Sequence, residues 1–218
     1  MTQRTLIPPL RTYPAVWAAA PALILVFVYA QSQTNLDSAV GYWTGIVGRS
    51  TAFVIFSCSL CAMLAAFDGA RLKRATDRHI ATVRPWWRVT WNLTWPTFAL
   101  ALLLQAFGLY LNSSGTWGSP SRFPWEIIAA WLAMILLHVA FGLVLGFFLP
   151  LVISAPLALI GSYSWLGFLW ALDYIPARYL SGLTMVNCCT PESRFPAEAA
   201  ASTITFSLVA FLVVLAII

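Results

Sequence analysis

Between Glu126 and Asp173 the chain contains no Asp, Glu, Lys or Arg. As one helix this stretch would be roughly 70 Å long, more than twice the hydrocarbon thickness of a bilayer, which is about 30 Å. Pro150 and Pro156 lie near its middle, which favours a division into two helices. Only 9% of the 218 residues are charged and 61% are hydrophobic, whereas an average soluble domain has about 25% charged residues. This composition excludes a soluble enzyme, a disordered chain and a protein that binds nucleic acid, and it predicts a membrane protein with several spans.

A helix that crosses a bilayer needs about 20 apolar residues, and six stretches of the chain satisfy this requirement. They predict spans at residues 14–32, 40–67, 89–111, 125–148, 151–172 and 199–218. The predicted fold class is therefore all-α, a polytopic membrane protein in which residues 1–218 form a single transmembrane domain. The basic N-terminus, its apolar core and the triplet Val28-Tyr29-Ala30 also match a cleavable signal peptide, and cleavage would leave the remaining topology unchanged.

The basic residues predict the orientation, because Lys and Arg concentrate in the cytoplasmic loops of membrane proteins. With a cytoplasmic N-terminus, eight of them lie inside: Arg4, Arg11, Arg71, Lys73, Arg74, Arg78, Arg84 and Arg88. Three then lie outside, namely Arg122, Arg178 and Arg194. We therefore expect both termini on the cytoplasmic side (N-in, C-in), with membrane lipid around the chain.

The segment from Asp68 to Arg88 joins the second and third predicted spans on the cytoplasmic side. Its arginines recur at three- and four-residue spacing, which predicts a short amphipathic helix on the membrane surface that ends before Pro85. One interpretation is a positive-inside anchor that binds anionic lipid. The other is a docking surface for a cytoplasmic partner, because a loop that only reversed the chain needs few residues. The candidate coupling residues are Asp68, Arg71, Lys73, Arg74, Asp77, Arg78 and Arg84.

Four polar residues within or beside the predicted spans are candidates for a substrate pathway: Arg49, Gln105, Glu126 and His138. A charge inside a span costs about 2.5–3.5 kcal/mol, so Arg49 should face a cavity, the bundle interior or a carboxylate. By depth, Glu126 and Asp37 are its nearest acidic partners. His138 and Gln105 each have two interpretations, as hydrogen-bonded links between helices or as residues of a proton or substrate pathway.

Glycines recur at four-residue spacing in two of the spans. Gly41 and Gly45 begin the second span, and Gly142 and Gly146 lie in the fourth. Residues this small let helices approach closely, either inside the chain or across a dimer.

The chain carries no recognisable motif for enzymatic chemistry. No phosphate-binding G-x-x-x-x-G-K-[ST] sequence surrounds Lys73, the single lysine. His79 and His138 lie on different segments, and neither has a partner at metal-ligand spacing. We therefore expect no catalytic residue, metal or cofactor in this chain.

The segment Asp173–Ser202 joins the last two predicted spans on the outer side. Its apolar middle, Tyr179–Val186, predicts a re-entrant or interfacial helix pair. The candidate residues of an outer gate are Tyr179, Cys188, Cys189 and Pro191. Adjacent cysteines rarely bridge each other, so a disulfide to another subunit and a pair of free thiols both stay open.

The order of these elements resembles the membrane subunit of ABC-2-type (type V) exporters, the permease half of an ATP-binding cassette transporter. Six spans carry the resemblance, together with the cytoplasmic N-terminus, the long basic loop after the second span, the tight turn Phe148-Leu149-Pro150-Leu151 and the outer segment before the last span. The resemblance implies that Asp68–Arg88 is the coupling helix that inserts into the nucleotide-binding subunit. It also implies that Tyr179–Pro196 corresponds to the outer re-entrant helices that gate the exit.

The same resemblance implies the partners and the cargo. Two permeases would form a homodimer or heterodimer with two separate cytoplasmic ATPase subunits, which bind the ATP and Mg. Similar systems export drugs, antibiotics, peptides or lipids. The abundant Ala and Trp and the excess of Arg over Lys are typical of a high-GC bacterium such as an actinomycete, so the expected location is the bacterial inner (plasma) membrane.

Two other classes of function stay open. A secondary carrier, or the substrate-capture subunit of an uptake transporter, would depend on intramembrane ionisable groups, for which Arg49 and His138 qualify. A non-transporting membrane protein, such as an immunity or assembly factor, would act without any ATPase partner.

Overall fold

The computed structural model describes residues 10–32, 41–77, 86–169, 174–182 and 197–216. Every regular element within these ranges is a helix, and six stretches, with α2 and α3 taken as one, are long and apolar enough to cross a membrane. The described residues therefore form an all-α, multi-pass membrane protein, as predicted. In chain order the elements are η1 (Leu10–Thr12), α1 (Pro14–Ser32), α2 (Trp43–Ser50), α3 (Phe53–Asp77), α4 (Trp86–Asn112), α5 (Trp125–Phe148), α6 (Leu151–Leu169), α7 (Ile175–Ser181) and α8 (Ala197–Ala216).

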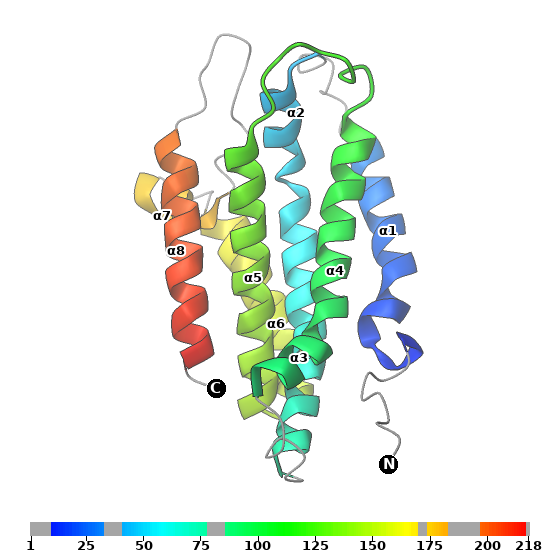
Figure 1. Cartoon of the computed structure of the whole chain (residues 1–218), viewed down its shortest axis with the longest axis vertical. Helices are drawn as coiled ribbons and strands as arrows, with labels where there is room; N and C mark the ends of the chain where they lie inside the picture. The colour runs from blue at the N-terminus through cyan, green and yellow to red at the C-terminus, as the bar shows by residue number, and fades with distance from the viewer. Residues whose placement is uncertain (1–9, 33–40, 78–85, 170–173, 183–196, 217–218) are drawn as a thin grey trace.

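The long helices run up and down a single bundle, and α1 begins at the same end at which α8 finishes (Figure 1). Helix α3 is the central one and packs against α5, α6, α4 and α1. Inside the protein, 72% of the apolar stretch of α2–α3 is buried, compared with 22% for α1 and for α8. Helices α1 and α8 therefore present most of their surface to the surroundings, while α3 presents little.

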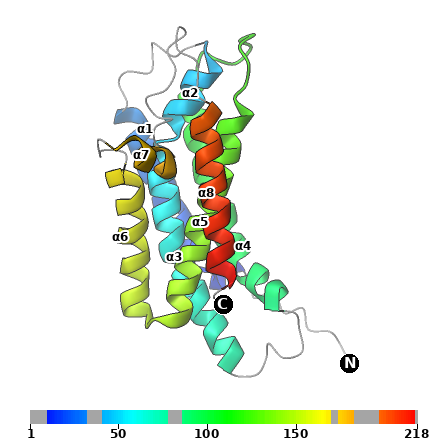
Figure 2. The same cartoon turned by 90° about the vertical axis from the view of Figure 1, so that its left-hand side faces the viewer.

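The helices of the second span differ from the sequence-based prediction in two respects. The span consists of two helices, since α2 ends at Ser50 and α3 begins at Phe53. Helix α3 then continues without interruption to Asp77, so the described part of the predicted surface helix is the last part of the span helix itself. In Figure 2 this end of α3 projects below the ends of α6 and α8. The basic residues there are compatible with a helix C-terminus, because cations interact favourably with the negative end of the helix dipole.

The central contact of the bundle is a seam of small residues between α3 and α5. A Cβ atom on Gly142 would overlap the carbonyl of Ala62, and one on Gly146 would overlap the carbonyl of Ala66. From the other side, a Cβ atom on Gly69 would overlap the carbonyl of Leu143. The backbones of the two helices therefore touch directly, which confirms that Gly142 and Gly146 permit close approach inside the chain.

Replacing Gly146 by alanine should destabilise the bundle by about 1–3 kcal/mol, because the added methyl group meets the backbone of α3, which cannot move aside cheaply. The midpoint of thermal unfolding of the purified protein in detergent should fall by several degrees.

The matched control is Gly167→Ala on α6, where the new Cβ atom lies 3.8 Å from the ring of Tyr163, an ordinary van der Waals distance. Since alanine forms helices better than glycine, this variant should be neutral or slightly stabilised. Equal midpoints for the two variants would contradict the direct backbone contact between α3 and α5.

Candidate functional site

The most unusual group inside the bundle is the carboxylate of Asp68, whose residue is 0% exposed. The hydroxyl of Thr97 on α4 donates a hydrogen bond of 2.7 Å to Asp68 Oδ2. The Arg71 guanidinium, one turn further along α3, lies 3.8 Å from Oδ1. Asp68 is held inside because its neighbour Gly69 belongs to the seam against α5. The carboxylate therefore sits where three helices meet, with one cation beside it.

Arg71 extends this cluster to the start of the chain. Its Nη2 atom donates a hydrogen bond of 2.6 Å to the carbonyl of Thr12, just before α1. The next residue, Tyr13, is 1% exposed and donates its hydroxyl to the carbonyl of Asn92 on α4 at 2.9 Å. Burial raises the pKa of Tyr13, the negative charge of Asp68 raises it further, and Arg71 lowers it. We call the five residues Thr12, Tyr13, Asp68, Arg71 and Thr97 the inner cluster, which ties α3 to α4 and to the entry of α1.

The inner cluster carries an energetic cost. Asp68 Oδ1 accepts no hydrogen bond from the described residues, although it is fully buried. Burying a carboxylate is expensive unless an opposite charge and hydrogen bonds compensate it, and removing one partner of such a pair is strongly destabilising. Ionisable residues retained inside membrane proteins usually mark functional positions. Asp68 is therefore the leading candidate among the predicted site residues.

The remaining predicted coupling residues separate into an exposed group and an undescribed group. Lys73, Arg74 and Asp77 are exposed on the final turns of α3, beyond the inner cluster. Arg74 also donates through Nε to the carbonyl of Ala70 in its own helix at 3.2 Å. Arg78 and Arg84 lie outside the described residues. The described coupling residues thus occupy one continuous helix, with Asp68 at its buried part and the cations at its exposed end.

A second polar cluster lies at the break between α2 and α3. Thr51 and Ala52 make backbone hydrogen bonds of 3.0 Å to residues three positions earlier, so the chain tightens there. The hydroxyl of Ser50 bonds back to the carbonyl of Ile46 at 2.8 Å, a pattern that bends helices. Gln105 of α4 donates a hydrogen bond of 2.8 Å to the Ser50 carbonyl. It thereby gives this backbone group a partner where the regular helix is interrupted inside the span.

Two further side chains complete this second polar cluster. We call it the break cluster, and it consists of Ser50, Thr51, Gln105, Asn112 and Trp131. Asn112 donates to the Ser50 hydroxyl at 3.2 Å, and the indole of Trp131 on α5 donates to the Thr51 hydroxyl at 2.9 Å. Gln105 therefore acts as a hydrogen-bonded link between helices, which is one of its two predicted roles.

Arg49 is half-buried on the last turn of α2, directly before this cluster. Glu126 forms its ion pair with Arg122 at 3.8 Å, where the Arg122 side chain is largely exposed.

His138 faces another helix. Its Nδ1 atom lies 3.0 Å from the hydroxyl of Ser162 on α6, and the residue is 4% exposed. This geometry fits the hydrogen-bonded interpretation of His138. The ring also lines a hollow of about 190 Å³, together with Trp165 of α6 and Phe206 of α8. Among the described residues, no three His, Cys, Asp or Glu side chains gather into a group that would hold a metal ion.

The predicted outer gate is described only in part. Tyr179 lies on the short helix α7, and its carbonyl accepts a hydrogen bond of 2.6 Å from Thr203 of α8. Helix α7 is followed by Gly182, whose φ of 72° is a backbone conformation that favours glycine. Cys188, Cys189 and Pro191 lie outside the described residues.

Sequence reasoning missed Thr97 of the inner cluster and Asn112 of the break cluster. Both lie in the charge-free stretch of α4, where polar residues recur at three- to eight-residue intervals: Thr90, Thr94, Thr97, Gln105 and Asn112. This spacing places them on one face of a helix. All of them are buried, so the polar stripe was the available signal.

No family model matches the chain, and neither a curated protein nor a solved structure matches it.

Replacing Thr97 by valine should cost about 1–3 kcal/mol of stability, because the buried carboxylate of Asp68 loses its hydrogen-bond donor. Thr94→Val is the matched control, since the Thr94 hydroxyl donates only within its own helix, to the carbonyl of Thr90 at 3.0 Å. Thermal unfolding in detergent should separate the two variants by several degrees, with Thr97→Val the less stable. Equal unfolding midpoints would contradict a structural role for the Asp68–Thr97 bond.

Proposed function

We propose that this chain is the permease subunit of an ATP-binding cassette exporter of the ABC-2 type, located in a bacterial plasma membrane. The observation that carries the proposal is the continuity of α3. This helix runs from the break at Thr51, through the buried Asp68, to the exposed cations Lys73 and Arg74. A rigid element of this kind can carry a displacement from a cytoplasmic partner into the centre of the membrane domain.

The charge pattern supports a partner at this end. The chain holds twelve Lys and Arg residues, and eight of them lie before α1 or between residues 68 and 88. The chain has no phosphate-binding motif of its own, so the energy source would be a separate ATPase subunit. A cationic helix end favours association with an acidic surface, because complementary charges steer encounter and fix register.

The inner cluster supplies the mechanical connection. If the exposed end of α3 moves, Asp68 and Arg71 move with it, because they belong to the same helix. The bonds from Asp68 to Thr97 and from Arg71 to Thr12 then carry the movement to α4 and to the entry of α1. At the far end of α3, the break at Thr51 lets α2 reorient relative to α3. Two permeases and two ATPases would form the complete exporter, with the pathway lined by helices of the bundle.

The test measures ATP hydrolysis by a cassette ATPase subunit that is co-expressed with this chain, with the complex reconstituted in lipid. The wild-type chain should stimulate hydrolysis. Reversing both exposed cations, Lys73→Glu with Arg74→Glu, should reduce this stimulation by about tenfold or more, because like charges at an interface cost several kcal/mol.

Arg122→Glu is the matched control, since Arg122 is also an exposed cation and lies at the opposite end of the bundle. It should leave the stimulation unchanged. Stimulation that survives the double reversal, or that is lost equally with Arg122→Glu, would contradict docking on α3. A chain that stimulates no ATPase would favour a carrier or a non-transporting protein.

A further inference from the structure

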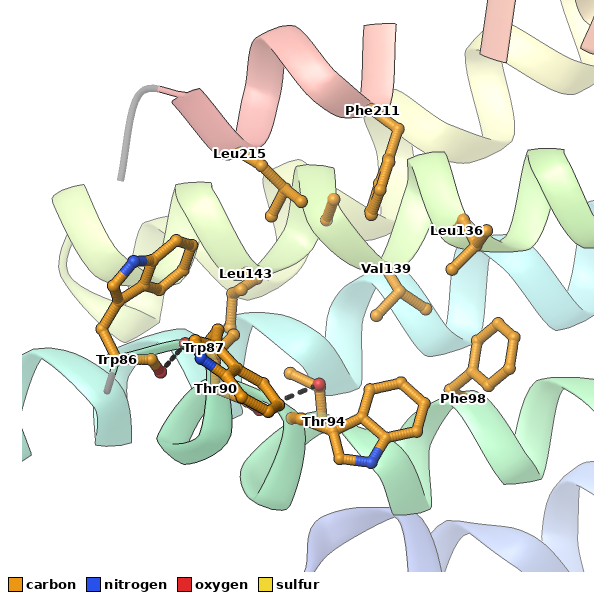
Figure 3. A pocket seen from close by; sticks show the side chains of 12 residues that line it. Trp86, Trp87, Thr90, Thr94, Phe98, Leu136, Val139, Leu143, Phe211 and Leu215 are labelled. Atoms are coloured by element: carbon orange, nitrogen blue, oxygen red, sulfur yellow. Dashed lines mark hydrogen bonds between the residues drawn. The ribbon is translucent and has the colours of Figure 1, made fainter. Parts of the chain in front are cut away.

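A hollow of about 410 Å³ lies between α4, α5 and α8 (Figure 3). Trp86, Trp87 and Trp91 line it from the first turns of α4, and Phe211 and Leu215 line it from α8. Leu143 of α5 lies between these two walls. The hollow belongs neither to the inner cluster nor to the break cluster, and we call it the α4–α8 groove.

The lining of the groove is mainly apolar, and its threonine hydroxyls already have hydrogen-bond partners. Its two hydroxyl side chains are satisfied within α4, since Thr90 donates to the carbonyl of Trp86 and Thr94 to the carbonyl of Thr90, each at 3.0 Å. The dashed bonds in Figure 3 show both hydroxyls turned to their own helix. An occupant therefore meets mainly hydrocarbon and aromatic rings, which matches the chemistry of an acyl chain, and the indole N–H groups of the three tryptophans are the polar donors of the lining.

A positive charge lies next to the lining of the groove, against the ring of Trp87. Trp86 and Trp87 are 49% and 56% exposed, as expected for rings anchored at the membrane interface. Arg88 is exposed beside them, with its guanidinium carbon 5.1 Å from the centre of the Trp87 ring. This is the end of the bundle that the charge pattern assigns to the cytoplasm, where the leaflet is rich in anionic lipid.

The volume of the groove suits an acyl chain, which is thin and can enter lengthwise. A groove of about 410 Å³ also falls within the range of ligand pockets, roughly 300–1,000 Å³.

We propose that the α4–α8 groove binds one acyl chain of an anionic phospholipid whose phosphate contacts Arg88. The lipid fills the space between α4 and α8 and holds both helices against α5. This site does not depend on the proposed transport function, because it rests on the groove and its cation alone.

The test uses the full chain in nanodiscs of phosphatidylcholine that carry a trace of a photoactivatable acyl-chain lipid, either phosphatidylglycerol or phosphatidylcholine. Mass spectrometry then locates the labelled residues. Phosphatidylglycerol should label the first turns of α4 and the end of α8 about fivefold more than phosphatidylcholine, the selectivity expected from one cation near a membrane surface. Arg88→Gln should abolish this preference, while the exposed Arg122→Gln should preserve it.

A second pair of variants tests the cavity itself. Ala140 lines the α4–α8 groove, and Ala210 lines the smaller hollow beside His138. Ala140→Phe should reduce labelling of α4 and α8 by both lipids several-fold, whereas Ala210→Phe should leave it unchanged. If Ala140→Phe does not fold, the Arg88→Gln comparison decides alone. Equal labelling by the two lipids, labelling of the exposed face of α1 as strong as that of the groove, or a preference that survives Arg88→Gln would overturn the proposal.

Discussion

The direct contact between the backbones of α3 and α5 is the interaction on which the other features of this bundle depend. In a bilayer, lipid tails are as apolar as the helix surfaces, so association relies on close packing rather than on the hydrophobic effect. Gly69, Gly142 and Gly146 allow this packing because each lacks the atom that would meet the facing helix. The seam makes α3 the most buried helix and brings Asp68 into the interior. A carboxylate there needs hydrogen bonds and an opposite charge to compensate for its burial.

From this seam the proposed mechanism follows in physical steps. Helix α3 is anchored along α5, bonded to α4 through Thr97, and linked to the chain start through Arg71. Its exposed end carries cations, and its opposite end meets the Ser50–Thr51 break, which side chains from α4 and α5 stabilise. A displacement at one end therefore has a rigid path and a place where the chain can bend. The cost of the buried carboxylate is consistent with selection for this connection rather than for stability alone.

The sequence predicted the spans well wherever apolar length was the deciding property. The bounds of α1 and α5 match the predictions, since twenty apolar residues between polar flanks leave little choice. The sequence did not predict that α3 continues past Asp68, because a charged carboxylate usually lies outside the apolar core of the membrane and therefore marks the end of a span. The burial of Asp68 depends on partners outside its own stretch of sequence, since Thr97 on another helix donates a hydrogen bond to it and α5 packs directly against Gly69. The break at Thr51 was hidden for a similar reason, as its partners Gln105 and Trp131 are distant in sequence.

The central claim is that the exposed end of α3 contacts an ATP-hydrolysing partner, and the single lysine, Lys73, tests it directly. Treating the reconstituted complex with a short amine-reactive crosslinker should join the two subunits through Lys73, as identified by mass spectrometry. Lys73→Arg keeps the positive charge but removes the reactive amine, so the crosslink should disappear while the complex persists. A crosslink of unchanged yield in Lys73→Arg, or a wild-type complex in which Lys73 reacts only as a free amine, would contradict the account.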